Sequence, residues 1–251
     1  MNLVTHILHL VGSSGVAYFT ARQIRDPLTR PNTLAMFQLA ESGAVPMLEK
    51  LSDRAAAEGD TWLSERLAQH ADDEKRHGQI FAHALKQINK QVIDFKSQSK
   101  KAETTQRSPF FDAYFEGYTS EQLKPEAINW DVFMGSTYIL ELDASKDFAR
   151  MAKVLPEDEA TSRNLKKSLY SVANDETGHA AYLYEAMMRR MSAANVQELV
   201  DAWRTRKVNA MLAMIGGLLQ PKGQLPNLVQ EGMPQEVTEE SPAKVSDLAA
   251  A

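Results

Sequence analysis

Hydrophobic residues recur at helical spacing along most of the chain. Near the N-terminus, Leu3, Val4, Ile7, Leu8 and Val11 lie three or four positions apart, which predicts a first helix over residues 3–25. The same spacing predicts further helices over about 33–58, 61–92, 110–118, 125–156, 157–190 and 195–219.

Capping and breaking residues separate these segments. Pro27 and Pro31 are expected to form the first turn, with Asn32 or Thr33 capping the helix that follows. Gly59 and Asp60 predict a second turn. The acidic run at 157–159 is expected in the first turn of one helix, and Asn195 is expected to cap the last helix.

Two segments depart from the helical pattern. Residues 93–107 are polar and aperiodic, and Ser108 with Pro109 then starts a short aromatic helix over 110–118. That aromatic segment is expected to cover one end of the bundle, with a substrate lid as the alternative. Residues 221–251 contain four prolines and no aromatic residue, so a disordered C-terminal tail is expected.

The order of helices predicts two long hairpins joined by a long connection, with an extra helix at each end. The fold class is therefore all-α, built on a four-helix bundle with a long crossover. We expect one domain over residues 1–220, with the core bundle at about 33–192.

Composition narrows the function. The net charge of −5 argues against a nucleic-acid-binding protein, and the absence of cysteine excludes disulfides, thiolate metal sites and iron–sulfur clusters. No stretch approaches the ~18 apolar residues of a membrane span. The N-terminus lacks the basic start of a secretion signal, so a cytoplasmic location is expected.

Two short motifs suggest a metal site. Glu74 and His77 are three residues apart, as are Glu176 and His179, and an aspartate precedes each glutamate. Residues at this spacing share one helix face, so each pair can point into the bundle together. A carboxylate with an imidazole is a suitable partial ligand set for iron or manganese.

Two further glutamates complete the pattern. Glu41 lies on the helix before the first motif and Glu141 on the helix before the second. At ~1.5 Å per residue, Glu41 and Glu74 lie ~27 and ~22 Å from the turn at Gly59, and a turn near residue 158 would make Glu141 level with Glu176. All six side chains can then meet at one level of the bundle. The alternative is a bundle held by salt bridges without a metal. The cost of desolvating four carboxylates without a cation argues against that alternative.

This order of ligands resembles that of ferritin-like di-iron carboxylate proteins, over about residues 33–192. The string DEKRH resembles a signature of bacterial di-iron monooxygenases and plant acyl-carrier-protein desaturases. The second string, DETGH, has Gly178 where arginine is usual. Rubrerythrin-like, tRNA-hydroxylase-like and aldehyde-deformylating proteins are comparable relatives.

The resemblance implies a role for each residue. The metal ligands would be Glu41, Glu74, His77, Glu141, Glu176 and His179. Glu74 and either Glu141 or Glu176 would bridge or chelate the ions. Asp73 and Asp175 would accept hydrogen bonds from the histidines across the bundle, and Arg76 would pair with one of these aspartates.

The function that follows from the resemblance is an oxygen-dependent di-iron oxidase or oxygenase, acting by hydroxylation, desaturation or a related oxidation. Its cofactors would be two iron ions, or manganese with iron, and dioxygen would be the co-substrate. A small or lipid-like substrate and a separate electron donor are expected, as is a homodimer; the tRNA-hydroxylase-like relatives leave a tRNA substrate open. The alternatives are a ferroxidase or iron-handling protein and a peroxide-reducing protein.

Several nearby residues have less specific interpretations. Pro46 should kink its helix near Glu41. The small residues between them either leave room for oxygen or substrate or pack closely against a neighbouring helix. Ser145 could offer a hydroxyl to bound oxygen or bond to its own helix. Tyr138 and Tyr182, one turn from ligands, are expected to be buried packing residues, with redox-active residues or hydrogen-bond donors to the ligands as the alternative. The histidines outside the two motifs are expected to be structural or exposed: His6, His9, His70 and His83.

Overall fold

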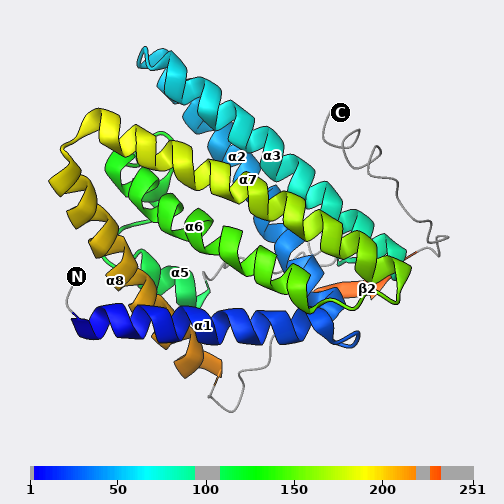
Figure 1. The fold of residues 1–251 in the computed structure, drawn as a ribbon. Helices are drawn as coiled ribbons and strands as arrows, with labels where there is room; N and C mark the ends of the chain where they lie inside the picture. The colour runs from blue at the N-terminus through cyan, green and yellow to red at the C-terminus, as the bar shows by residue number, and fades with distance from the viewer. Residues whose placement is uncertain (1–2, 94–107, 219–226, 233–251) are drawn as a thin grey trace.

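The computed structural model describes residues 3–93, 108–218 and 227–232, and most of these residues are helical (Figure 1). This agrees with the predicted all-α class. The helices are α1 (Leu3–Arg25), α2 (Arg30–Ala57), α3 (Thr61–Gln87), α5 (Pro109–Tyr114), α6 (Trp130–Val154), α7 (Ala160–Arg190) and α8 (Ala193–Leu218). Among the described residues, no helix has the length and apolar character needed to cross a membrane.

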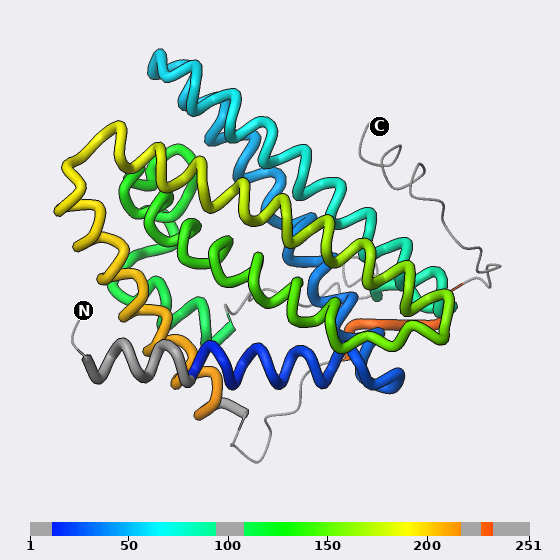
Figure 2. Tube along the Cα trace, in the orientation of Figure 1, coloured from blue at the N-terminus to red at the C-terminus, as the bar shows by residue number. Residues whose placement is uncertain are grey.

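Four long helices form two antiparallel hairpins. α2 and α3 make the first, α6 and α7 make the second, and α3 packs against α7 to join them. α1 and α8 pack against α6 and against each other, and the short α5 packs against α8. In the Cα trace, α1 lies across the α6 side of the molecule, and α8 crosses α1 (Figure 2).

Local chemistry sets the turn of each hairpin. Between α2 and α3, Gly59 has a φ of 84°, a value that favours glycine, and Asp60 caps α3 by accepting a hydrogen bond from the Leu63 amide at 3.0 Å. α6 ends at Val154 and α7 begins at Ala160, so the second turn is centred near the position that the ligand spacing requires.

Some predicted helix starts are wrong. α2 begins at Arg30, with Pro31 inside its first turn, where a missing amide hydrogen costs nothing. α6 begins at Trp130 because Asn129 caps it, accepting from the Asp131 amide at 2.7 Å. Asn195 does not cap α8, because the Ser192 hydroxyl accepts from the Asn195 amide and the helix begins at Ala193.

The third helix was expected to continue to residue 92, but it ends at Gln87. Asn89 adopts a left-handed φ of 58°, and Lys90–Val92 forms strand β1. Strand β2 (Val229–Glu231) pairs antiparallel with it, so the predicted disorder of the tail is wrong for this part. Leu228 and Val229 also pack on the core, which supplies the apolar burial that the prediction overlooked. The rest of 221–251 lies outside the described residues.

Two other predictions agree only in part. The acidic run was expected in the first turn of α7, but α7 begins at Ala160 and the run precedes it, with Glu159 at the N-cap. The aromatic helix was expected to reach residue 118, but it ends at Tyr114. Ser108 caps α5, and the aromatic segment packs against α8 and α6, where the Tyr114 hydroxyl donates to the Ser136 carbonyl at 2.8 Å. A 3₁₀ turn, η1 (Glu121–Leu123), follows. Most of the polar segment 93–107 lies outside the described residues.

The hydrophobic core is divided into two clusters along the hairpins. On α3, Leu67 belongs to the first cluster and Phe81 to the second. On α7, Leu183 belongs to the first and Leu169 to the second. The polar motif residues lie between these positions on both helices, so a buried polar layer separates two apolar layers.

Close packing at Gly135 provides a test of the fold. A Cβ at Gly135 on α6 would lie 2.5 Å from the Trp203 ring on α8, whereas a Cβ at Gly178 on α7 would meet nothing within 4 Å. We expect Gly135→Ala to lower the free energy of unfolding, because a clash costing about 1–3 kcal/mol exceeds the gain in helix propensity. Gly178→Ala should raise it by about 0.5–1 kcal/mol.

Urea unfolding of the metal-free protein measures both changes. Equal effects of the two substitutions would contradict the packing of α8 on α6 described here.

Candidate metal centre

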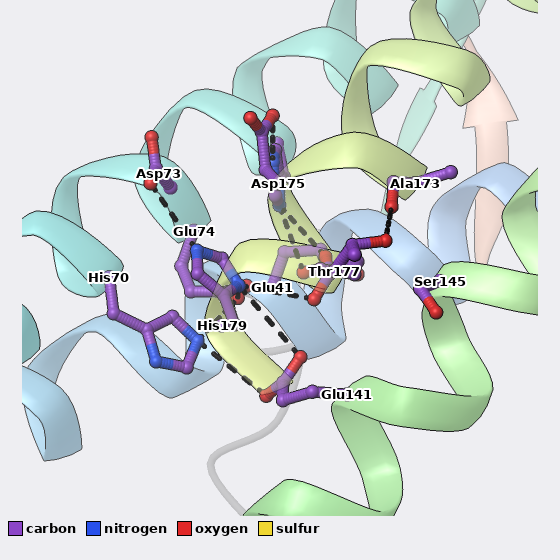
Figure 3. Close-up of polar contacts among 12 residues, drawn as sticks. Glu41, His70, Asp73, Glu74, Glu141, Ser145, Ala173, Asp175, Thr177 and His179 are labelled. Atoms are coloured by element: carbon purple, nitrogen blue, oxygen red, sulfur yellow. Dashed lines mark hydrogen bonds and ion pairs between the residues drawn. The ribbon is translucent and has the colours of Figure 1, made fainter. Parts of the chain in front are cut away.

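The structure brings all six predicted ligands together and adds a seventh residue, His70. They form two groups of four side chains, with the ligand atoms of each group within 4.8 Å of one another. The first group is His70, Glu74, Glu141 and His179; the second is Glu41, Glu74, His77 and Glu176. Glu74 belongs to both groups and therefore lies where one carboxylate could contact two ions. Figure 3 shows this cluster between α3, α7, α2 and α6.

Helical spacing explains the arrangement. On α3, His70, Glu74 and His77 follow at intervals of four and three residues, so all three side chains share the inner face. All three are buried, with side-chain exposures of 1%, 4% and 0%. On α7, Glu176 and His179 are buried in the same way. α2 and α6 each contribute one glutamate from the facing side.

His70 is the functional candidate that sequence reasoning missed. Its Nε2 lies 3.0 Å from Glu74 Oε1 and 3.5 Å from Glu141 Oε1, and its Nδ1 lies 2.8 Å from the Tyr182 hydroxyl. Its ring also stacks on His179, with centroids 3.7 Å apart. The available signal was its position four residues before Glu74, on the face that carries the first motif.

Two aspartates hold the motif histidines from the opposite helix. His77 Nε2 on α3 lies 3.2 Å from Asp175 Oδ2 on α7, and His179 Nε2 on α7 lies 3.3 Å from Asp73 Oδ2 on α3. Arg76 donates to both aspartates. It was expected to pair with one of them; because Gly178 stands at the matching position on α7, a single arginine serves both pairs. Each histidine is thereby left with Nδ1 facing the glutamates.

The electrostatics of the glutamates reflect crowding of like charges. Burial raises the pKa of Glu74 far above its usual range, and Glu41, Glu141 and Glu176 add to the effect. Burial also raises the pKa of Glu141 to about 7, helped by Glu176. Burial opposes the ionisation of Glu176 as well, but its polar contacts with Glu141, His179 and His77 prevail and lower its pKa to about 2.

The histidines differ from one another in the same field. Burial lowers the pKa of His70 to about 3, so this ring is neutral and its Nε2 can act as a ligand. Burial also disfavours the charged forms of His77 and His179, but the neighbouring carboxylates outweigh it and raise their pKa values to about 10 and about 11. Without a metal, protons supply the positive charge among the glutamates.

Two buried polar atoms without a hydrogen-bond partner indicate that the cluster suits a cation. His77 Nδ1 and Glu176 Oε1 are buried and 3.2 Å apart, yet neither makes a hydrogen bond. An unpaired buried polar atom is costly, and a metal ion between them would satisfy both. Imidazole and carboxylate donors in these numbers fit iron or manganese.

The other candidates lie outside the cluster or support it. The Ser145 hydroxyl donates to the Leu142 carbonyl of its own helix, and Figure 3 shows it apart from the glutamates. Tyr138 is half-buried against Tyr184. Tyr182, expected to be a packing residue, is buried and hydrogen-bonds to His70. His83 pairs with Gln87, and the side chains of His6 and His9 lie outside the described residues.

Comparisons with known proteins add no relative: no family model, no curated protein and no solved structure matches the chain. The assignment of the cluster therefore depends on its own geometry and donor chemistry.

Proton release should accompany metal binding. A bound cation must displace the protons held by His77, His179 and Glu74, whose pKa values lie above neutrality. We expect apparent Mn²⁺ affinity to rise with pH between 6 and 8, with roughly three protons released per filled centre at pH 8. Calorimetry in two buffers of different ionisation enthalpy measures this number. Affinity independent of pH would contradict the assignment.

Replacement of His70 should weaken one metal position and spare the other. His70→Ala removes a donor from the group with Glu141, while the group with Glu41 keeps all four members. We expect the second Mn²⁺ to bind about tenfold or more weakly and the first to be retained. Titration monitored by electron paramagnetic resonance distinguishes the two, with His83→Ala as the control on the same helix. Equal behaviour of the two variants would remove His70 from the ligand set.

Proposed function

We propose that the protein is a ferritin-like di-iron oxidase or oxygenase that uses dioxygen to oxidise an organic substrate. The observation that carries the proposal is the pair of four-residue groups joined by Glu74. Its supporting features are the two helical hairpins, the level placement of the ligands and the aspartate-supported histidines.

Charge balance supports two dications in particular. Four glutamates meet in the cluster: Glu41, Glu74, Glu141 and Glu176. Two divalent ions would neutralise four carboxylates, whereas one ion would leave two charges in a buried site. The three histidines would then bind as neutral rings, each with its second nitrogen held by Asp73, Asp175 or Tyr182.

Two ferrous ions, or a manganese–iron pair, would supply the electrons that activate dioxygen when bound. The chain itself positions the ligands and keeps bulk water out. The apolar layers on both sides of the cluster restrict its contact with solvent, and Glu74 and Glu176 are almost fully buried.

The reaction needs electrons from outside the chain. Hydroxylation of a C–H bond consumes one dioxygen, two electrons and two protons, and yields an alcohol and one water. Desaturation uses the same inputs and yields an alkene and two waters. The chain has no cysteine to hold an iron–sulfur or rubredoxin centre, so a separate reductase or small reductant is required.

Iron counting tests the proposal. Metal-free protein is loaded with excess Fe²⁺, exposed to oxygen and desalted, and the retained iron is measured per chain. We expect about two irons per chain. Many irons per chain would instead indicate storage, and retention of neither iron nor manganese would refute the metal centre.

A double substitution provides the matched control. Glu74→Gln/Glu176→Gln keeps the shape of the cluster and removes two of the four carboxylates, including the shared one. This variant should retain less than one iron per chain. Wild-type and variant proteins should show the same far-ultraviolet circular dichroism, so that a loss of iron is separated from a loss of fold.

A further inference from the structure

A pocket of about 430 Å³ opens beside one half of the cluster. It lies between α2, α6 and the α5–η1 segment, and its lining includes Ala44, Met47 and Phe133. Two of the candidate ligands, His70 and Glu141, also line it. Figure 3 shows these two side chains meeting at one edge of the cluster. A molecule in this pocket would therefore lie against the group that contains His70.

The lining has a distinct chemistry. Among the described residues that line it, the only polar side chains besides His70 and Glu141 are Ser136 and Thr137, and none is a lysine or arginine. The Ser136 hydroxyl already donates to the Phe133 carbonyl at 3.1 Å. In the metal-free protein, an anionic group in this pocket would lose its hydration next to a carboxylate, without a cation to replace the water. The chemistry thus favours an uncharged apolar group.

Aromatic residues extend the apolar surface outward. Phe111 on α5 lines the pocket, and 44% of its surface is exposed. Phe115 and Leu123 line the pocket beside it. A large exposed aromatic ring at a concave apolar site is typical of ligand contact. The pocket volume lies within the range of about 300–1,000 Å³ usual for small-molecule sites.

We infer that this pocket binds the substrate of the proposed oxidation, and that the bound part of the substrate is an uncharged alkyl or aryl group. The identification of the bound molecule as the substrate rests on the proposed function, whereas the binding of an uncharged apolar molecule does not.

A second pocket of about 350 Å³ serves as an internal comparison. It lies between α1, α2, α6 and α8 and shares Leu140 with the first pocket. Its lining carries the ion pair between Lys207 and Asp143, and none of the seven candidate metal ligands lines it. It therefore differs from the first pocket in carrying a lysine–aspartate ion pair, and the candidate metal ligands do not line it.

The sequence offers matched positions in the two pockets. Ala44 lies three residues after Glu41 and lines the first pocket, while Ala144 lies three residues after Glu141 and lines the second. Phenylalanine at either position adds the same volume, three residues after a candidate ligand. Ala44→Phe would fill the pocket beside the metal centre, and Ala144→Phe would fill the other.

Two fluorescent probes with one skeleton test the inference. N-phenyl-1-naphthylamine is uncharged at neutral pH, and 8-anilino-1-naphthalenesulfonate adds one sulfonate. We expect metal-free wild-type protein to bind the uncharged probe at about one per chain and the sulfonate at least tenfold more weakly. Ala44→Phe should weaken the uncharged probe at least tenfold, and Ala144→Phe by less than about twofold. Met47→Phe, one turn further along α2, provides an independent block of the same pocket.

The outcomes separate the pocket from the metal chemistry. Equal weakening by both alanine substitutions, no weakening by either Ala44→Phe or Met47→Phe, or tight binding of the sulfonate would overturn the inference. Iron retention is counted on the same samples. Loss of the probe in Ala44→Phe without any iron binding in the wild type would keep the pocket and refute the proposed function. Two irons per wild-type chain, with probe binding unaffected by Ala44→Phe and Met47→Phe, would support the proposed function and refute the pocket.

Discussion

The meeting of four glutamate side chains at one level of a helical core, two of them almost fully buried, is the constraint on which the rest of the structure depends. Carboxylates so placed repel one another and have lost their hydration, so positive charge must enter with them. In the protein alone that charge is carried by protons, on His77 and His179 and on Glu74. Cations can replace those protons, which links the stability of the core directly to metal binding.

The α3–α7 side and the α2–α6 side of the bundle surround the glutamates in different ways. Between α3 and α7 the helices pack directly, and the Asp73–His179 and Asp175–His77 pairs cross the interface with Arg76 between them. Between α2 and α6, a pocket reaches the ligands instead. One side therefore fixes the orientation of the donors, and the other leaves room beside them.

Much of the centre could be predicted from the sequence because helical periodicity is a local property. The i, i+3 spacing of Glu74 and His77, repeated at Glu176 and His179, fixed which side chains share a face. His70 was missed because a lone histidine four residues before a glutamate looks like any core or surface histidine until its neighbours on other helices are known. The pairing of β1 with β2 was missed for a related reason: it joins segments about 140 residues apart, which no local pattern reports.

His70 also makes the two halves of the centre unequal. The half beside the pocket has two imidazoles and two carboxylates, and the other half has one imidazole and three carboxylates. Imidazole favours iron more than manganese, whereas carboxylate suits manganese well. In the proposed centre, a mixed pair would therefore place manganese in the half with Glu41 and iron in the half with His70. That half lies against the apolar pocket, so the same histidine that breaks the symmetry of the ligands also marks the side on which a substrate would meet the metal.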